Sequence, residues 1–389
     1  MARGKTSMST REKQGLGVIF VLFFIFATSL FFSLRAHAAP SNLRLIETGP
    51  NQRQWMTESQ VGELARQQHE QGHCGGFMDV TEHPQSNGMV VFSPTIPNRP
   101  LPTHGDQVQR ILPELSAANL IENVTRLSDF RNRFYKSELG AKAANWIKDQ
   151  FIELAKGRTD VKVELFKHSF LQPSVIATIQ GTGPHAKEHV ILGAHEDSVN
   201  WKGSWIAPDA NARAPGADDD ASGVATLLET YRVLMDSGFR PDRTLVFMTY
   251  AGEELGLLGS QDIAQKFRAD NKIVAGVLQL DMTLFPGQNR TITFINDHVD
   301  QGLTKFTEML VDAYVKAPWR EAPCNYACSD HASWSKAGYP SAFPFEAPMG
   351  EDNPKIHTED DTLQNNLDAA FGLHFAKLAT AFAIELASE

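Results

Sequence analysis

The chain has 389 residues, of which 42% are apolar, 21% are charged and 9% are aromatic, and its formal net charge at pH 7 is -10. This composition is typical of a globular protein and excludes collagen, coiled coils and wholesale disorder. The acidic balance also argues against a nucleic-acid partner, because binding to nucleic acid depends on basic residues that neutralise phosphates. The length alone suggests roughly two domains.

Residues 1–38 have the features of a signal peptide. Basic residues precede an apolar run over residues 16–32, and Ala36 and Ala38 stand at the small-residue positions that a signal peptidase requires. An uncleaved membrane anchor is the alternative, since the apolar run approaches the ~20 residues that span a bilayer. We expect cleavage, which predicts a secreted protein (extracellular, or periplasmic in transit) without stable membrane association, in which disulfides can form.

Residues 39–102 are expected to form a small pro-region or accessory segment. Helical spacing covers residues 58–69, a turn into a short strand follows at residues 74–80, and four prolines within residues 93–103 indicate a linker.

The sequence His69-Glu-Gln-Gly-His73 in this segment spells the zinc-binding motif HExxH. That motif needs both histidines on one face of a continuous helix. Here Gly72 lies inside it and Cys74-Gly-Gly ends the helix, so we interpret it as a surface helix end. A second hypothesis is that His73 or Cys74 blocks the zinc site of a zymogen.

From residue 103 to the C-terminus, helical and strand-like patterns alternate. We expect helices over residues 107–127, 140–155, 221–237, 259–267, 301–315 and 368–387, and strands over 161–166, 174–180, 189–194, 244–250, 273–280 and 291–294. This alternation predicts an α/β fold with a mostly parallel central sheet and helices on both faces. Residues 103–389 are therefore the predicted catalytic domain, with its active groups at the carboxyl ends of the strands.

Five clusters of histidine and carboxylate residues occur in this domain, and three of them end predicted strands. A charged loop or a helix cap could explain each cluster alone. Together, two histidines and several carboxylates make a site suited to zinc, with a carboxylate able to bridge two ions. The clusters are His195 with Asp197 as the partner of its other ring nitrogen, Asp218 to Asp220, Glu253 with Glu254, Asp281, and His357.

In this order the motifs resemble those of the secreted bacterial leucyl aminopeptidases. These are two-zinc enzymes in a broader family that includes glutamate carboxypeptidase and the transferrin receptor. The resemblance runs from about residue 105 to the C-terminus. The motifs are His195-x-Asp197-Ser, Pro215-Gly-Ala-Asp-Asp-Asp-Ala-Ser-Gly, Tyr250-Ala-x-Glu-Glu-x-Gly-Leu, Gln279-Leu-Asp-Met-Thr, Cys324-x-Tyr-Ala-Cys-Ser-Asp-His-Ala-Ser-Trp and Asn353-Pro-x-Ile-His-Thr.

Carried over position by position, the resemblance implies a pair of zinc ions bridged by Asp219. One ion would also bind His195 and Asp281, and the other would also bind Glu254 and His357.

The resemblance further implies the catalytic roles. Glu253 would activate a metal-bridging water and then pass the proton to the leaving amine. Tyr326 would hold the developing oxyanion. Carboxylates such as Glu254 and Asp281 would meet the free ammonium of the substrate, which restricts the enzyme to peptides with a free N-terminus.

The resemblance also implies a disulfide between Cys324 and Cys328 beside the specificity pocket, with two reduced thiols as the alternative. The pocket residues would favour leucine and other apolar first residues. Relatives carry an aromatic residue at one of these positions, Met349, so the residue preference stays open. The residues at pocket positions are Met282, Phe345, Met349 and Ile356.

Three other functions are weighed against a monomeric, secreted, zinc-dependent leucyl aminopeptidase. If the protein were a glutaminyl cyclase-like transferase, we would expect a single zinc ion. A carboxypeptidase of the same fold needs basic residues to hold a substrate carboxylate, whereas the clusters here supply carboxylates and apolar groups. A catalytically inactive binding module predicts missing ligands, and all five ligands and Glu253 are in place.

Overall fold

The computed structural model describes residues 43–49, 52–70, 76–84, 101–201 and 210–388. The predicted signal peptide, most of the predicted linker, and His73 and Cys74 of the zymogen hypothesis lie outside these residues. The described residues all belong to one compact unit.

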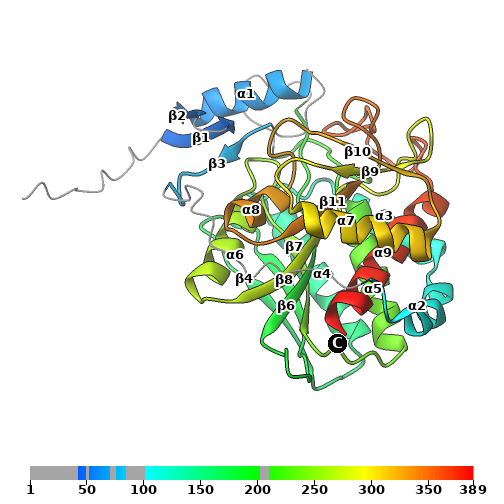
Figure 1. Cartoon of the computed structure of the whole chain (residues 1–389). Coiled ribbons are helices and arrows are strands. Elements are labelled where there is room, and N and C mark those ends of the chain that lie inside the picture. The colour runs from blue at the N-terminus through cyan, green and yellow to red at the C-terminus, as the bar shows by residue number, and fades with distance from the viewer. Residues whose placement is uncertain (1–42, 50–51, 71–75, 85–100, 202–209, 389) are drawn as a thin grey trace, which may run out of the picture. The chain divides into compact units, whose positions relative to one another are not determined.

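An eight-stranded sheet forms the centre of the catalytic domain (Figure 1). Its strands are β4 (Val161–Phe166), β5 (Ser174–Ile179), β6 (Glu188–His195), β7 (Thr244–Tyr250), β8 (Ile273–Gln279), β9 (Ile292–Ile295), β10 (Trp319–Ala322) and β11 (Ser341–Phe345). They lie in the order β10-β9-β11-β8-β6-β7-β5-β4. The middle strands β11, β8, β6 and β7 pair in parallel, and antiparallel pairs occur only nearer the two edges. The predicted α/β fold is confirmed.

Helices cover both faces of this sheet. They are α2 (Gly105–Ile111), α3 (Ala117–Ser128), α4 (Glu138–Leu154), α5 (Ala221–Asp236), α6 (Leu258–Ala269), α7 (Gln301–Leu310), α8 (His331–Lys336) and α9 (Ala369–Ala387). Because side chains alternate along a strand, Val190 and Leu192 of β6 belong to the apolar cluster that includes residues of α3, α4, α5, α7 and α9, whereas Ile191 belongs to the cluster with α6 and α8. The helix α9 is apolar enough to cross a membrane by composition, but it is a mostly buried core helix here.

The prediction of a single helix over residues 107–127 is wrong. The chain forms α2, a 3₁₀ turn at Leu112–Glu114, and then α3. Pro113 is tolerated at the start of the turn but has no N–H for a continuous helix. Ser116 then begins α3, because its hydroxyl accepts a hydrogen bond from Asn119 N at 3.4 Å.

The accessory segment forms its own small sheet and helix. An antiparallel sheet in the order β2-β1-β3 contains β1 (Leu43–Gly49), β2 (Gln52–Thr57) and β3 (Met78–Asp79), and α1 (Glu58–Glu70) follows β2. The segment contacts the turn that follows β7 and the helix α6: Asp79 N donates to Gly256 O at 3.0 Å, and Gln261 Nε2 donates to Asp79 O at 3.0 Å. Phe77, at 2% exposure, is buried in the same interface.

A half-buried aspartate on α6, Asp262, connects this segment to the catalytic domain. His83 Nε2 lies 2.7 Å from Asp262 Oδ1, and His168 Nδ1 lies 2.7 Å from Asp262 Oδ2. Burial opposes ionisation of Asp262, but the hydrogen bonds from the two histidines outweigh it and lower the pKa of Asp262 to about 2.

We expect Asp262→Asn to lower the free energy of unfolding at neutral pH by about 2 kcal/mol, the equivalent of a pKa lowered from 3.8 to about 2. The stabilisation by this carboxylate is complete above its unfolded pKa and is lost as pH falls through the folded value. Urea denaturation at several pH values between about 7 and 2 measures it, with the exposed Asp149→Asn as control. The prediction fails if Asp262→Asn and wild type lose stability in parallel below pH 4.

Candidate metal centre and active site

The candidate site lies where three neighbouring strands end. Strand β6 pairs in parallel with both β7 and β8, so the carboxyl ends of these strands meet at one edge of the sheet. The remaining ligand candidates come from the turn before α5 and the loop before α9. The positions are His195 at the end of β6, Glu253 and Glu254 after β7, Asp281 after β8, Asp219 before α5, and His357 before α9.

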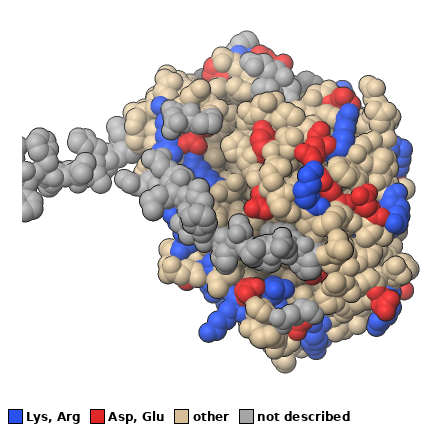
Figure 2. Space-filling view, in the orientation of Figure 1, with Lys and Arg blue, Asp and Glu red and all other residues tan. Residues whose placement is uncertain are grey.

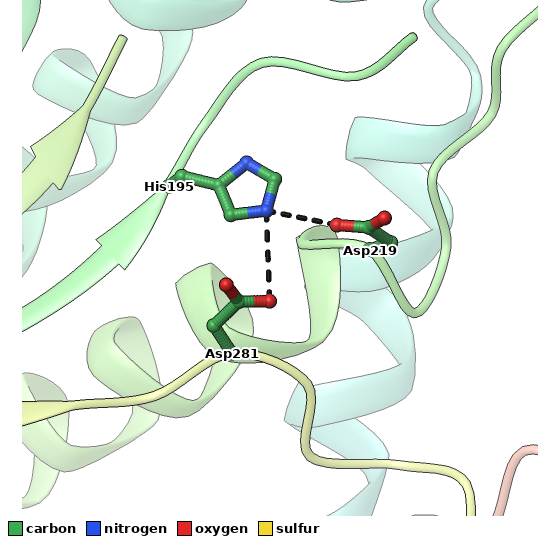
Figure 3. A group of neighbouring side chains, drawn as sticks. All are labelled: His195, Asp219 and Asp281. Atoms are coloured by element: carbon green, nitrogen blue, oxygen red, sulfur yellow. Dashed lines mark hydrogen bonds and ion pairs between the residues drawn. The ribbon is translucent and has the colours of Figure 1, made fainter. Parts of the chain in front are cut away.

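One group of three potential ligands gathers around His195 (Figure 3). Its Nε2 lies 2.8 Å from Asp219 Oδ1 and 3.6 Å from Asp281 Oδ1. All three side chains are buried, and their ligand atoms lie within 4.8 Å of one another. Ser329, which the sequence motifs contain but which we did not single out, donates to Asp281 Oδ2 at 2.6 Å and fixes that carboxylate.

A second group of three shares Asp219 with the first. His357 Nε2 lies 2.9 Å from Asp219 Oδ2 and 2.8 Å from Glu254 Oε2. Thus each oxygen of the Asp219 carboxylate faces one histidine, as expected of a bridging ligand. Within the described part of the chain, Glu254 Oε1 is buried without a hydrogen-bond partner. A buried carboxylate oxygen of this kind is costly unless a cation meets it, so the residues present fit zinc.

The pKa values of these buried carboxyl groups are shifted in opposite directions. Burial opposes ionisation of Asp219, but hydrogen bonds with His195 and His357 outweigh it and hold the pKa of Asp219 below its ordinary range. Burial raises the pKa of Glu254 to about 7, and it raises the pKa of Glu253 well above the ordinary value. A glutamate that readily holds a proton is suited to general acid–base work.

Asp197 joins two of the ligand-bearing loops. Its Oδ1 accepts a hydrogen bond from Glu253 N at 3.0 Å, and its Oδ2 accepts one from Glu254 N at 3.4 Å. The same carboxylate lies 3.6 Å from Nδ1 of His195, the ring nitrogen that points away from the ligand group. Asp197 therefore lies beside His195, as the prediction requires, and also fixes the backbone of the glutamate pair.

The three adjacent aspartates have three different environments. Asp220 caps α5 by accepting from Gly223 N at 2.7 Å, and its other oxygen accepts from His195 N at 3.0 Å. Asp219 faces the two histidines. Asp218 points to the opposite side, where it accepts from Leu284 N at 3.2 Å and from Asn353 Nδ2 at 3.0 Å. Only one carboxylate of the triplet is therefore placed as a ligand.

Sequence reasoning missed Asp361 and Arg133. Asp361 accepts hydrogen bonds from the backbone N–H groups of Asp218 and Asp219, both at 3.1 Å, and so holds the turn that carries the shared ligand. Its place in the acidic loop after His357 was a signal, but nothing in the sequence separated it from its acidic neighbours. Arg133 lies in the connection between α3 and α4, outside every recognised motif.

The predicted pocket residues meet in one apolar cluster. Met282, Phe345 and Ile356 are buried together with Tyr326, and Met349 packs against them. The Tyr326 hydroxyl lies 3.7 Å from Met349 Sδ. The predicted disulfide between Cys324 and Cys328 is present in the same cluster.

The fold and the site together define a metal-dependent hydrolase: an α/β sheet that collects histidines and buried carboxylates at its strand ends. The sequence matches peptidase family M28 over residues 174–383. It is 39% identical over 349 residues to a "Probable leucine aminopeptidase" of Arthroderma otae, covering 89% of this chain and 92% of the relative. It is 39% identical over 339 residues to "Leucine aminopeptidase 1" of Fusarium vanettenii, covering 84% and 83%. The chain belongs to peptidase family M28.

Solved structures agree with this assignment. LapB from Legionella pneumophila superposes with a TM-score of 0.77 at 30% identity, covering 90% of this chain and all of that chain. The LapA aminopeptidase of the same organism gives a TM-score of 0.78 at 29% identity, with the same coverage. A glutaminyl cyclase from Porphyromonas gingivalis, at 17% identity and a TM-score of 0.55, shares the fold alone. The aminopeptidase family recognised from the motifs, and with it the zinc-dependent class of enzyme, is confirmed.

Proposed function

We propose that this protein is a secreted, monomeric aminopeptidase that uses two zinc ions to remove leucine and other apolar residues from the N-termini of peptides. The observation that carries the proposal is the Asp219 carboxylate, whose two oxygens each face one histidine within two buried ligand groups. The leucine aminopeptidase names of the relatives, which align along most of the chain, support the same activity.

The proposed chemistry divides between the ligand groups and the side chains beside them. His195 and Asp281 with Asp219, and Glu254 and His357 with Asp219, would hold the ions. Bound zinc supplies a lowered pKa for water and stabilisation of charge that develops on the scissile carbonyl.

The remaining steps belong to the protein's own groups. Glu253 takes a proton from the attacking water and delivers it to the departing amine; its buried carboxyl, with a raised pKa, holds that proton between the two transfers. Tyr326 donates a hydrogen bond to the carbonyl oxygen as negative charge develops on it.

Specificity for an apolar first residue follows from the cluster beside this site. Met282, Phe345 and Ile356 present apolar surface, and Met349 adds a flexible wall. The carboxylates of Glu254 and Asp281 supply the negative charge that attracts the substrate's ammonium.

We propose that residues 1–38 are removed as a signal peptide and that residues 39–102 stay attached as an accessory segment. The support is the interface described above, in which Asp79 and Phe77 pack on the turn after the glutamate pair. A segment that shares buried core with the catalytic domain contributes to folding stability, so removing it would expose apolar surface.

Three variants test the assignment of roles. Asp219→Asn should lose bound zinc, because it replaces the carboxylate shared by both ligand groups with a neutral amide. Glu253→Gln should keep its zinc while kcat falls by about 10²–10⁴, the usual range for loss of a general base. Tyr326→Phe should keep its zinc and lose about 10² in kcat. Metal content by mass spectrometry and kcat on leucine p-nitroanilide are the measurements, and a Glu253→Gln enzyme with wild-type kcat would refute the mechanism.

Free-amine recognition is tested with a matched pair of substrates. We expect hydrolysis of leucine p-nitroanilide but not of its N-acetylated form, loss of activity with chelator, and recovery as zinc is restored to two ions per chain. Equal cleavage of both substrates would show that the ammonium is not recognised. Full recovery at one zinc ion would contradict the two-ion site.

Sequencing the N-terminus of the exported, active protein tests the processing. We expect it to begin close to Ala39, with the accessory segment retained. An active protein beginning near residue 103 would identify residues 39–102 as a removable pro-region instead.

A further inference from the structure

Arg133 is the only lysine or arginine that is buried among the residues that the structure describes, with 0% of its surface exposed. It lies beside a concentration of buried carboxylates. Asp361, Asp220, Asp197 and Asp219 are the acidic groups whose charges act on it most strongly. A buried guanidinium in such a place is costly unless its N–H groups are satisfied and its charge is balanced.

The guanidinium is satisfied by backbone carbonyls of two of the loops that carry ligands, those of His195 and Asp219. Its Nε donates to Glu196 O at 2.9 Å, in the residue directly after His195. Its Nη1 donates to Pro215 O, and its Nη2 donates to Gly216 O at 2.9 Å, in the turn that carries Asp219. One planar side chain therefore joins the loop after β6 to the turn before α5.

The backbone of Arg133 strengthens the same connection. Its N–H donates to Ser198 Oγ at 3.0 Å, and that hydroxyl donates to Ala214 O at 2.8 Å. Gly216 has a positive φ of 52°, and a Cβ there would lie 2.7 Å from Arg133 Nη2. The turn is thus shaped to admit the guanidinium.

The turn before α5 is held from two sides with opposite polarity. Arg133 binds carbonyl oxygens of the turn, whereas the Asp361 carboxylate accepts from the N–H groups of Asp218 and Asp219. Asp361 belongs to the loop that carries His357. Three of the five ligand-bearing segments, those with His195, Asp219 and His357, are therefore connected through one buried cation and one buried anion.

We propose that Arg133 is a positioning residue that sets the metal affinity of the site by fixing the His195 and Asp219 loops relative to each other. The inference rests on the proposed metal site. The planar fork is essential, because a lysine ammonium in the same place could not span both loops.

The test measures binding of Co²⁺ to the metal-free full-length protein by its visible absorption, without substrate. Arg133→Met removes the charge and the fork, and Arg133→Lys keeps only the charge. We expect Co²⁺ affinity to fall by about 10–100-fold in Arg133→Met, as for loss of other groups that orient metal ligands, and by a smaller factor in Arg133→Lys.

Arg243 provides the matched control. It also donates to backbone carbonyls, those of Leu386 and Ser388, but far along the chain from the ligand loops. Arg243→Met should lower thermal stability without changing Co²⁺ affinity. If Arg133→Met does not fold, the comparison of Arg133→Lys with Arg243→Lys decides.

Unchanged Co²⁺ affinity in a folded Arg133 variant would overturn the proposal and leave a purely stabilising role. Failure of the proposed peptidase function gives a different result, because wild type would then bind Co²⁺ in an Arg133-dependent way yet leave leucine p-nitroanilide intact. A wild-type protein that binds no Co²⁺ would refute both proposals.

Discussion

The structure depends on keeping a dense group of carboxylates away from water. Each such group loses its hydration and repels its neighbours, so it persists only where N–H donors, cations or a bound proton compensate it. The fold supplies the donors by directing backbone N–H groups inward. Asp197, Asp220 and Asp361 each accept from the backbone of a loop or strand that carries a candidate ligand. The hydrogen bonds that compensate the burial of these carboxylates also fix the backbone of the neighbouring loops.

Charged side chains are distributed differently on the surface than in the interior. On the face drawn in Figure 2, acidic and basic side chains are interspersed, so many of them neutralise one another in water. In the interior, Arg133 is the one buried lysine or arginine among the described residues, and the acidic groups around the site outnumber it. The net charge of -10 therefore does not describe the site, whose excess of negative charge is local and suited to divalent cations.

The sequence predicted the parts of the fold whose signal is strong and local. Strands β6, β7 and β8 are continuous apolar runs with charged groups at one end, and their predicted ends lie within a residue or two of the observed ones. Strands β10 and β11 and helix α8 were not predicted. Each is short, and β10 is only half-buried, so its pattern does not differ from that of a loop. The prediction of one helix over residues 107–127 was wrong because it followed the helical spacing of the apolar residues, which continues past Pro113.

In the candidate site, too, some residues could be predicted from local sequence signals and others could not. Ligand candidates such as His195 and Asp281 could be found because a charged residue ending an apolar strand is conspicuous. Within the aspartate triplet, composition alone does not separate the ligand position from the cap. The difference lies in backbone direction: Asp220 faces the first turn of α5, whereas Asp219 faces the two histidines.

Arg133 could not have been found in this way, because its partners are main-chain carbonyls. Every residue type has such a carbonyl, so the sequence carries no complementary pattern to pair with the arginine. Its role follows only from where the α3–α4 connection meets the loops at Glu196 and Gly216. Groups that orient ligands through the backbone are therefore absent from a motif even when the ligands depend on them. In the proposal for Arg133, the spacing of the two candidate ligand groups therefore depends on the α3–α4 connection as well as on the strands that carry the ligands.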